Sequence, residues 1–335
     1  MRDKILYELQ KNFPLVKRPF DYIAKSFSVS EDEVIKIVQE EKNRGIIRQI
    51  SAIFDTKRLG YESSLVAFEV DKEDIDKAVE ILNSHPGISH NYERNHQFNI
   101  WFTIAIPKNS LFGLENSVKL LAKLTNAKDY IVLPTLKLFK IMVKLDTTGK
   151  DSKKEKIKKK VYKDISLGEL HKKVIKYSHE DIKITKEPFK DTVRKIGIDY
   201  KEFFEILNEL KDAGVMRRFA AILAHRKAGF SANAMVVWDI DEKNAEEIGS
   251  KVASFRAVSH CYLRPKFENW QYNLFSMVHG KTKEETDNIV QEIESEIEYK
   301  SNLYLYSSRE FKKVRIKYFT DDIKRWEEYY AGQTC

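Results

Sequence analysis

The sequence predicts an α+β protein built from two tandem copies of one unit, each a helix-turn-helix followed by a ferredoxin-like β-α-β-β-α-β domain. The first observation behind this prediction is an internal repeat, because the segment from Arg18 aligns without a gap with the segment from Glu187. The second is the hydrophobic spacing, which changes in each copy from a helical period to alternating strands and helices. The third is a lysine-rich segment between the copies.

The repeat is long enough to define domains. It aligns "RPFDYIAKSFSVSEDEVIKIVQEEKNRGIIRQ" with "EPFKDTVRKIGIDYKEFFEILNELKDAGVMRR", then "ISHNYER" with "VSHCYLR", and "HQFNIWFTI" with "WQYNLFSMV" after four extra residues in the second copy. We expect helix-turn-helix domains at residues 1–60 and 165–229, ferredoxin-like domains at 61–145 and 230–335, and a linker at 146–164.

Each element follows from its own pattern. Phe20, Ile23 and Phe27, then Val34 and Ile37, recur at helical spacing around "SVSEDE", whose serine can cap the second helix. An extended piece, "IIRQISAIFD" or "VMRRFAAILA", comes next. The remaining expected elements of the first copy are strands at 65–70, 88–92, 98–106 and from 131, with helices at 74–83 and 114–124.

Both helices of such a domain lie on one face of an antiparallel sheet, so the other face needs a cover. The second copy is the obvious cover, and we expect the two copies to pack as an intramolecular pseudo-dimer. The lysine-rich segment lacks apolar residues and is typical of a solvated linker. A nucleic-acid-binding arm is the alternative.

The composition limits the possible partners. Lys and Arg total 59 against 51 Asp and Glu, a net charge of +8, which favours an anionic partner, either a nucleic acid or a polyanionic small molecule. Cys261 and Cys335 form no C-x-x-C motif, so neither a disulfide framework nor a cysteine metal site is indicated. The charged N-terminus and the absence of a long apolar run predict a soluble, cytoplasmic protein without a membrane partner.

The domain order resembles the Lrp/AsnC family of transcription regulators, which implies DNA binding. The second helix of each helix-turn-helix argues against that function. Residues 30–44 contain five acidic and three basic side chains, and residues 198–213 contain five acidic and two basic ones. Phosphate repels such helices, so we expect no DNA partner. A DNA-binding regulator remains the alternative function.

A second resemblance is more specific. The segments "VMRRFAAILAHRKAGFSANAMVVWDI", "SHCYLRPKFENWQYNLFSMVHG" and "SREFKKVRIKYF" look like the siroheme decarboxylase family of the alternative haem and haem d1 pathways. In that family two related subunits pair, and here both are fused. The resemblance implies loss of carbon dioxide from two acetate side chains of siroheme, with no cofactor beyond the iron-containing substrate. It leaves open which pathway is served.

The side chains suit that chemistry. Siroheme is a flat apolar macrocycle with a rim of carboxylates, which requires cations around aromatic walls. A histidine can protonate the carbon that loses carbon dioxide. We expect His260, with Tyr262, to be catalytic, and His90 to be its counterpart. The expected substrate-binding residues are Arg217, Arg218, His225, Arg226, Arg264, Trp270, Tyr272 and Asn273, with Arg48, Tyr92 and Arg94 in the first copy.

Residues 260, 262 and 264 alternate along a strand and are expected to share one face, and 90, 92 and 94 repeat that face. A structural role is the plain alternative for each of them. His260 or His90 could instead coordinate the substrate iron, although the protein alone is expected to hold no metal. The second copy keeps more of the sequence pattern that carries this resemblance. We therefore expect one productive pocket, lined mainly by residues of the second copy. Further association of fused chains is open.

Overall fold

A computed structural model describes residues 1–141, 154, 162–224 and 232–332. These residues fall into two compact units, one of 1–59 with 162–224 and one of 60–141 with 232–332. We call them the helical unit and the sheet unit. Each unit therefore combines the corresponding domains of the two copies. Most of the expected linker lies outside the described residues.

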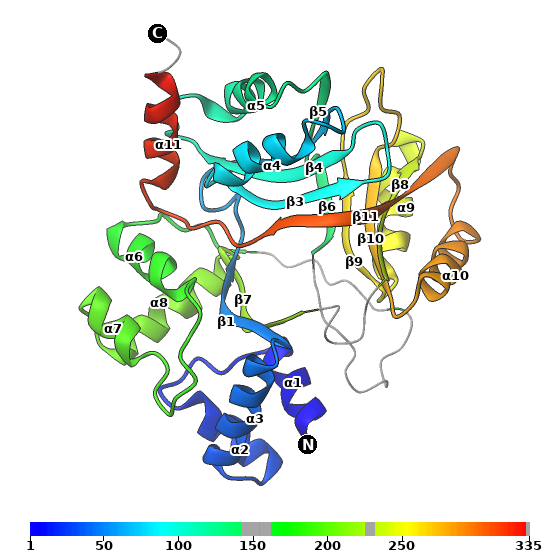
Figure 1. The fold of residues 1–335 in the computed structure, drawn as a ribbon. Coiled ribbons are helices and arrows are strands. Elements are labelled where there is room, and N and C mark those ends of the chain that lie inside the picture. Colours follow the sequence, from blue (N-terminus) through cyan, green and yellow to red (C-terminus); the bar gives the residue numbers. More distant parts are fainter. Residues whose placement is uncertain (142–153, 155–161, 225–231, 333–335) are drawn as a thin grey trace. The chain divides into compact units, whose positions relative to one another are not determined.

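The helical unit holds both helix-turn-helix segments. Its elements are α1 (Arg2–Lys11), α2 (Pro19–Phe27), α3 (Glu31–Asn43), β1 (Ile47–Phe54), α6 (Glu169–Ser178), α7 (Lys190–Ile196), α8 (Tyr200–Asp212) and β7 (Met216–Leu223). The expected extended pieces are β1 and β7, which pair with each other as an antiparallel ribbon. The two copies are thus joined at this ribbon (Figure 1).

Helix caps confirm the expected turns. Ser30 Oγ accepts a hydrogen bond from the Glu33 amide at 3.1 Å, and Asp199 accepts one from the Glu202 amide at 2.8 Å. Each satisfies an amide that the first turn of a helix leaves unpaired. The residue after the preceding helix is left-handed in both copies, Ser28 with φ 55° and Gly197 with φ 84°. Glycine adopts that conformation without steric cost, whereas serine does not.

The sheet unit holds both ferredoxin-like domains, and the expected element order is confirmed. The first copy supplies β2 (Tyr61–Glu69), α4 (Ile75–Ser84), β3 (Ile88–Arg94), β4 (Ile100–Pro107), α5 (Gly113–Leu124), β5 (Asp129–Pro134) and β6 (Lys137–Ile141). The second copy supplies β8 (Ala232–Asp239), η1 (Glu242–Asn244), α9 (Ala245–Ser254), β9 (Val258–Leu263), β10 (Leu274–Gly280), α10 (Lys283–Glu294), β11 (Ser301–Lys313) and α11 (Asp322–Ala331).

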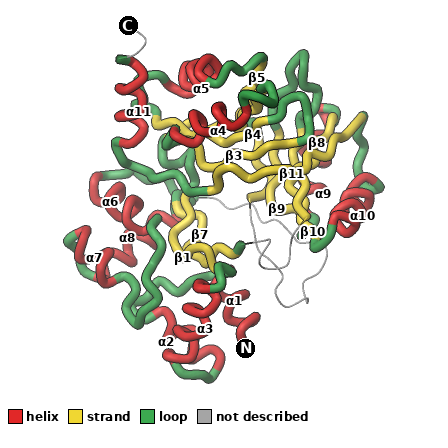
Figure 2. Tube along the Cα trace, in the orientation of Figure 1, coloured by secondary structure: helices red, strands yellow, loops and turns green. Residues whose placement is uncertain are grey.

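All the strands of this unit join one antiparallel sheet, in the order β5-β2-β4-β3-β11-β8-β10-β9-β6. The last strand of each copy is shared with the other copy. The first half of β11 pairs with β8 of its own copy, and its second half pairs with β3 of the first. Reciprocally, β5 pairs with β2 of its own copy, and β6 pairs with β9 of the second. Figure 2 shows these strands in yellow. The pseudo-dimer is therefore fastened by exchanged strands.

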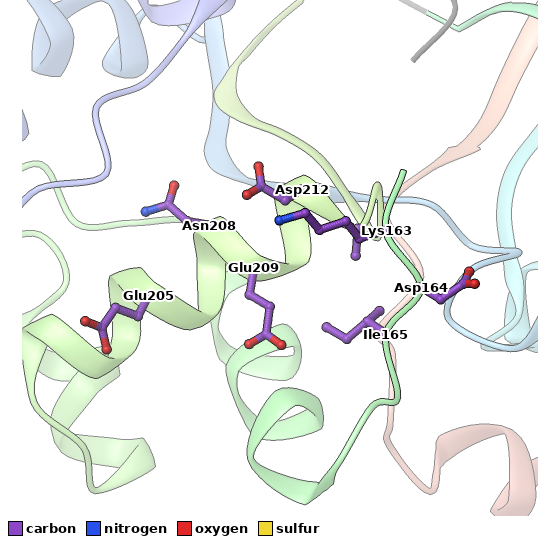
Figure 3. Close-up of a pocket in the computed structure, with 8 residues that line it drawn as sticks. Lys163, Asp164, Ile165, Glu205, Asn208, Glu209 and Asp212 are labelled. Atoms are coloured by element: carbon purple, nitrogen blue, oxygen red, sulfur yellow. The ribbon is translucent and has the colours of Figure 1, made fainter. Parts of the chain in front are cut away.

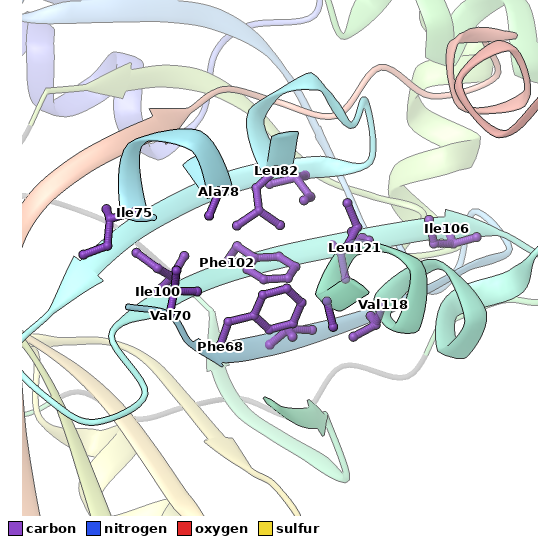
Figure 4. Packing of buried hydrophobic residues seen from close by; sticks show 14 of the residues in the cluster. Phe68, Val70, Ile75, Ala78, Leu82, Ile100, Phe102, Ile106, Val118 and Leu121 are labelled. Atoms are coloured by element: carbon purple, nitrogen blue, oxygen red, sulfur yellow. The ribbon is translucent and has the colours of Figure 1, made fainter. Parts of the chain in front are cut away.

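Apolar cores lie on both sides of the sheet. On the helix side of the first copy, Phe68 and Phe102 meet edge to face at 4.9 Å beneath α4 and α5 (Figure 4). A matching cluster underlies α9 and α10. On the other face, a third cluster combines Trp101 of the first copy with Trp270 and Phe275 of the second. We call this cluster the inter-sheet core, because each copy contributes its half of the sheet to it, and it is the cover that we expected from the sequence.

The C-terminal helix α11 was not expected from the sequence. Its Trp326 packs on the imidazole of His85 at 4.3 Å between ring centroids. Its fully buried Glu327 accepts hydrogen bonds from Ser110 Oγ and, at 2.9 Å, from the Leu111 amide. These contacts attach the end of the second copy to the first. Within the described parts of the chain, no helix is long and apolar enough to cross a membrane.

Candidate active site

A β-bulge in each copy places a serine and the histidine after it opposite a single residue of the neighbouring strand. In β9 the pair is Ser259 and His260, and in β3 it is Ser89 and His90. Bulges re-aim side chains in this way and are frequent beside active sites. Ser259 Oγ lies 2.7 Å from His260 Nδ1, and Ser89 Oγ lies 2.9 Å from His90 Nδ1. Each candidate histidine is therefore oriented by the serine that precedes it.

The second-copy row consists of His260, Tyr262 and Arg264. The rings of His260 and Tyr262 stack at 6.1 Å with an interplanar angle of 24°. The guanidinium of Arg264 lies 4.9 Å from the centroid of the Tyr262 ring. These contacts confirm that the three side chains share one face of β9. Tyr262 also packs against the inter-sheet core. The row therefore lies on the face of β9 that is turned toward the first copy.

The first-copy row repeats this arrangement. His90 and Tyr92 stack at 6.2 Å with an angle of 27°, and Arg94 lies 5.6 Å from the Tyr92 ring. The histidine environments differ, however. Ser89 Oγ lies 2.8 Å from the hydroxyl oxygen of Thr103, whereas the serine of the second copy contacts another histidine. The repeat therefore conserves the row of side chains but changes the residue that the serine contacts.

Both arginines are buried, and each reaches a strand of the other copy. Arg94 donates to the Leu305 carbonyl at 2.5 Å, and Arg264 donates to the Leu133 carbonyl. Burial lowers the pKa of each guanidinium to about 10, and no carboxylate of the described residues offsets that effect. Their Nε atoms have no hydrogen-bond partner among the described residues. Two buried cations without anionic partners are costly, and a carboxylate ligand would compensate them.

Trp270 lies in the inter-sheet core and is 2% exposed. Its ring lies 5.2 Å from Tyr272 and 5.3 Å from Trp101 of the first copy. The four extra residues of the second copy precede it, and there Asn269 donates to Asp129 at 2.7 Å. The insertion thus ties the copies together. Trp270 Nε1 lacks a partner among the described atoms, which leaves one buried donor without a hydrogen bond there.

Asn273 has a structural environment. Its Oδ1 accepts from the Ile240 amide at 3.0 Å, and its Nδ2 donates to the Ile240 carbonyl at 3.1 Å. Asn99 makes the same pair of bonds to Val70 in the first copy. Because the contact is duplicated and Asn273 is 1% exposed, it favours a role in fixing the strand end over contact with a substrate.

The strand edges opposite the two rows differ in chemistry. In β11, Glu310 lies opposite Tyr92 and Lys313 lies opposite His90. In β6, the corresponding residues opposite Tyr262 and His260 are Leu138 and Ile141. Directly opposed residues of an antiparallel pair point to the same face. The first-copy row therefore faces a charged edge, and the second-copy row faces an apolar one.

The other candidate arginines belong to the helical unit. Arg217 on β7 pairs with Asp55 at 2.7 Å, and both side chains are partly buried. Arg218 donates to the Gln10 carbonyl at 3.3 Å, and burial lowers the pKa of its guanidinium. Arg48 is exposed on β1. All three thus lie on the ribbon that joins the two helix-turn-helix segments. His225 and Arg226 lie outside the described residues.

Ser259 connects His260 to a second histidine that the sequence reasoning did not use. Ser259 Oγ lies 2.5 Å from His279 Nε2, and His279 Nδ1 lies 2.7 Å from Asn233 Oδ1. These residues come from β9, β10 and β8, which are adjacent in the sheet. The serine could have been found from the repeated "SH" of both copies. His279 could not, because only strand pairing brings it to Ser259.

A cavity of about 470 Å³ lies elsewhere, in the helical unit beside the C-terminal half of α8 (Figure 3). Glu205, Glu209, Asp212 and Asp164 line it, with Lys163 the one cation among its lining residues. An acidic cavity repels a substrate rimmed with carboxylates. We therefore place the candidate active site at the histidine rows and not in this cavity. Among the described residues, no cluster of three or more His, Cys, Asp or Glu could hold a metal.

Comparisons with known proteins agree with the domain order of this chain. Residues 58–140 and 227–312 match the family described as "AsnC-like ligand binding domain", and residues 2–48 match the "Siroheme decarboxylase NirDL-like HTH domain". The chain is 42% identical to the siroheme decarboxylase of Hydrogenobacter thermophilus over 97% of this chain and 96% of that one. It is also 39% identical to the siroheme decarboxylase beta subunit of Methanosarcina barkeri, over 43% of this chain and 95% of the subunit.

Solved structures show the same likeness. The crystal structure of the siroheme decarboxylase NirDL superposes with a TM-score of 0.78 at 36% identity, covering 99% of both chains. The same enzyme in complex with an iron-uroporphyrin III analogue superposes with a TM-score of 0.77. The tandem fold of this chain is therefore that of a fused, two-copy protein.

Proposed function

The chain belongs to the siroheme decarboxylase family, and from this we propose that it is a carboxy-lyase that converts siroheme to didecarboxysiroheme. The reaction removes the carboxyl groups of two acetate side chains as carbon dioxide. One observation carries the proposal: each histidine row ends in a buried arginine that lacks a carboxylate partner among the described residues. An anionic substrate would compensate these charges.

The substrate is proposed to bind through its carboxylate rim and its apolar face. In the sheet unit, Arg264 is the proposed cationic contact of the second copy, and Tyr262 and Tyr272 are proposed to pack against the macrocycle. Arg217 and Arg218 of the helical unit stay separate predicted contacts. We propose that no cofactor beyond the iron-containing substrate is required. The tetrapyrrole itself accepts the electron pair that carbon dioxide leaves behind.

The chemical step needs a proton at a defined place. When the bond to the carboxyl carbon breaks, negative charge develops on the methylene carbon and spreads into the macrocycle. A proton delivered there completes the methyl group. His260 is the proposed donor: Nδ1 is engaged by Ser259, so its Nε2 is the nitrogen proposed to face the substrate. Tyr262 is proposed to hold the imidazole by stacking.

The second-copy row is the better candidate for the productive site. Its opposing edge presents Leu138 and Ile141, which suit a flat apolar macrocycle. The first-copy row faces Glu310 and Lys313, an ion pair at 3.6 Å that gives this edge a charged surface instead of an apolar wall for the macrocycle. We therefore propose one productive pocket, walled mainly by the second copy, with His90 in a lesser role.

Anaerobic incubation of the purified protein with siroheme tests this function. Mass spectrometry should show two successive losses of the mass of carbon dioxide, and visible spectra should show a shifted Soret band on binding. A band shift without mass loss would mean that the protein binds a tetrapyrrole but is no decarboxylase. The same spectra distinguish the two roles of His260, because removing an axial ligand of iron changes the bound spectrum and removing a proton donor does not.

A further inference from the structure

We propose that His279, Ser259 and His260 form a proton relay that supplies a proton to the catalytic imidazole as it protonates the substrate, with His279 as the proton reservoir. The inference rests on the proposed function and extends it to residues outside the substrate contacts. The Ser259 hydroxyl is the bridge, 2.7 Å from His260 Nδ1 and 2.5 Å from His279 Nε2. Both distances are short for hydrogen bonds. His279 is a positioning and proton-supplying residue.

The hydrogen-bond partners define the direction of transfer. Asn233 Oδ1 lies 2.7 Å from His279 Nδ1 and accepts its N–H in either charge state. The exchangeable proton of His279 is therefore the one on Nε2, which points to Ser259. In the loaded state, His279 is an imidazolium that donates to the serine oxygen, and the serine hydroxyl donates to His260 Nδ1.

The step balances without any further reactant. As the acetate loses carbon dioxide, the electron pair of the broken C–C bond forms a C–H bond with the proton of His260 Nε2. His260 Nδ1 takes the proton of the Ser259 hydroxyl, and the serine oxygen takes the proton of His279 Nε2. The net result is one proton moved from His279 to the substrate carbon. Both imidazoles end neutral, with the proton of His260 now on Nδ1. Before the next turnover, solvent protonates His260 Nε2, and the Nδ1 proton returns through the Ser259 hydroxyl to His279 Nε2, which restores the loaded state.

The first copy lacks this reservoir. In the aligned segments, Ala105 occupies the position of His279, and Ser89 instead contacts the hydroxyl of Thr103 at 2.8 Å. A threonine hydroxyl does not carry an extra proton near neutral pH, whereas a histidine does. Siroheme needs two protons for its two acetates, so a refillable donor suits the second-copy row. The relay is thus a chemical difference between the two otherwise repeated rows.

The test is a single-turnover comparison of His279→Gln, Ser259→Ala and Ser259→Thr with the unaltered protein. Glutamine and alanine should slow both losses of carbon dioxide by about 10- to 100-fold, as removal of an outer hydrogen-bonding partner commonly does. Both losses are affected because the neutral His260 gives up its Nε2 proton only as its Nδ1 takes one through Ser259. Threonine, which keeps the hydroxyl, should restore both rates.

Siroheme affinity, measured from the Soret band, should stay unchanged in all three variants. His171→Gln, which removes a histidine of the helical unit, is the matched control and should retain both rates. Unchanged rates in His279→Gln and Ser259→Ala would overturn the relay. Equal slowing of both steps together with weaker siroheme binding would also overturn it, because that result would indicate a structural role. Circular dichroism checks folding, and the serine variants decide the outcome should His279→Gln misfold. An unaltered protein that releases no carbon dioxide would refute the proposed function itself.

Discussion

Replacing His260 by alanine should abolish most of the turnover while leaving the fold intact, and His90→Ala should cost much less. A lost general acid slows catalysis by about 100- to 10,000-fold. This corresponds to roughly 2.7 to 5.4 kcal/mol of activation free energy. The asymmetry follows from the proton supply behind His260 and from the apolar edge that faces it.

The structure also bounds the effect on stability. His260 is partly buried, and the contacts that it loses include a hydrogen bond to Ser259 and a stacking contact with Tyr262. Each is worth about 0.5–1.5 kcal/mol. The sum of about 1–3 kcal/mol is smaller than the 5–15 kcal/mol by which a typical domain is stable. The variant should therefore fold, and its loss of activity should be chemical.

The assay is anaerobic turnover of siroheme followed by mass spectrometry, combined with a Soret titration of each variant. We expect near-normal binding by His260→Ala with turnover at least 100-fold lower. Equal and large losses in both histidine variants would refute the asymmetric site and favour two working sites, one for each acetate. Loss of binding by His260→Ala, with a changed spectrum of the bound substrate, would identify the residue as an iron ligand.

Three further outcomes are expected. Arg264→Ala and Arg217→Ala should weaken siroheme binding by roughly 1.5–3 kcal/mol for each lost charge-assisted hydrogen bond. The loss should be smaller at Arg217, because Asp55 already pairs with it. Unchanged siroheme affinity in both variants would mean that other residues bind the carboxylate rim. Burial lowers the pKa of His85 from 6.5 to about 3 in the folded protein. Between these two pH values the unfolded chain binds more protons than the folded protein, so the free energy of unfolding should fall as the pH drops from 6.5 toward 3. His85→Phe, which copies Phe255 of the second copy, should flatten this dependence in urea titrations, and a slope equal to that of the unaltered protein would contradict the assignment. Specific DNA binding should be absent or weak in gel-shift assays, and a salt-sensitive, sequence-selective shift at nanomolar protein would restore the regulator hypothesis.

Local rules account for what could be predicted of the fold. The repeat defined two copies, the spacing of apolar residues placed their helices and strands, and Ser30 capped α3 as its position before acidic residues indicates. Caps and side-chain alternation depend on neighbours within a few residues. For the same reason the sequence alone placed His260, Tyr262 and Arg264 on one face.

Tertiary pairing decided the rest. The exchange of β6 and β11 between the copies depends on strand partners far apart in the chain, which local pattern does not specify. The bulge that turns Ser259 toward His260 exists only because β9 pairs with β10 in that register. His279 reads as an ordinary strand end in the sequence. It becomes part of a proton path because the sheet places its Nε2 2.5 Å from a serine twenty positions earlier.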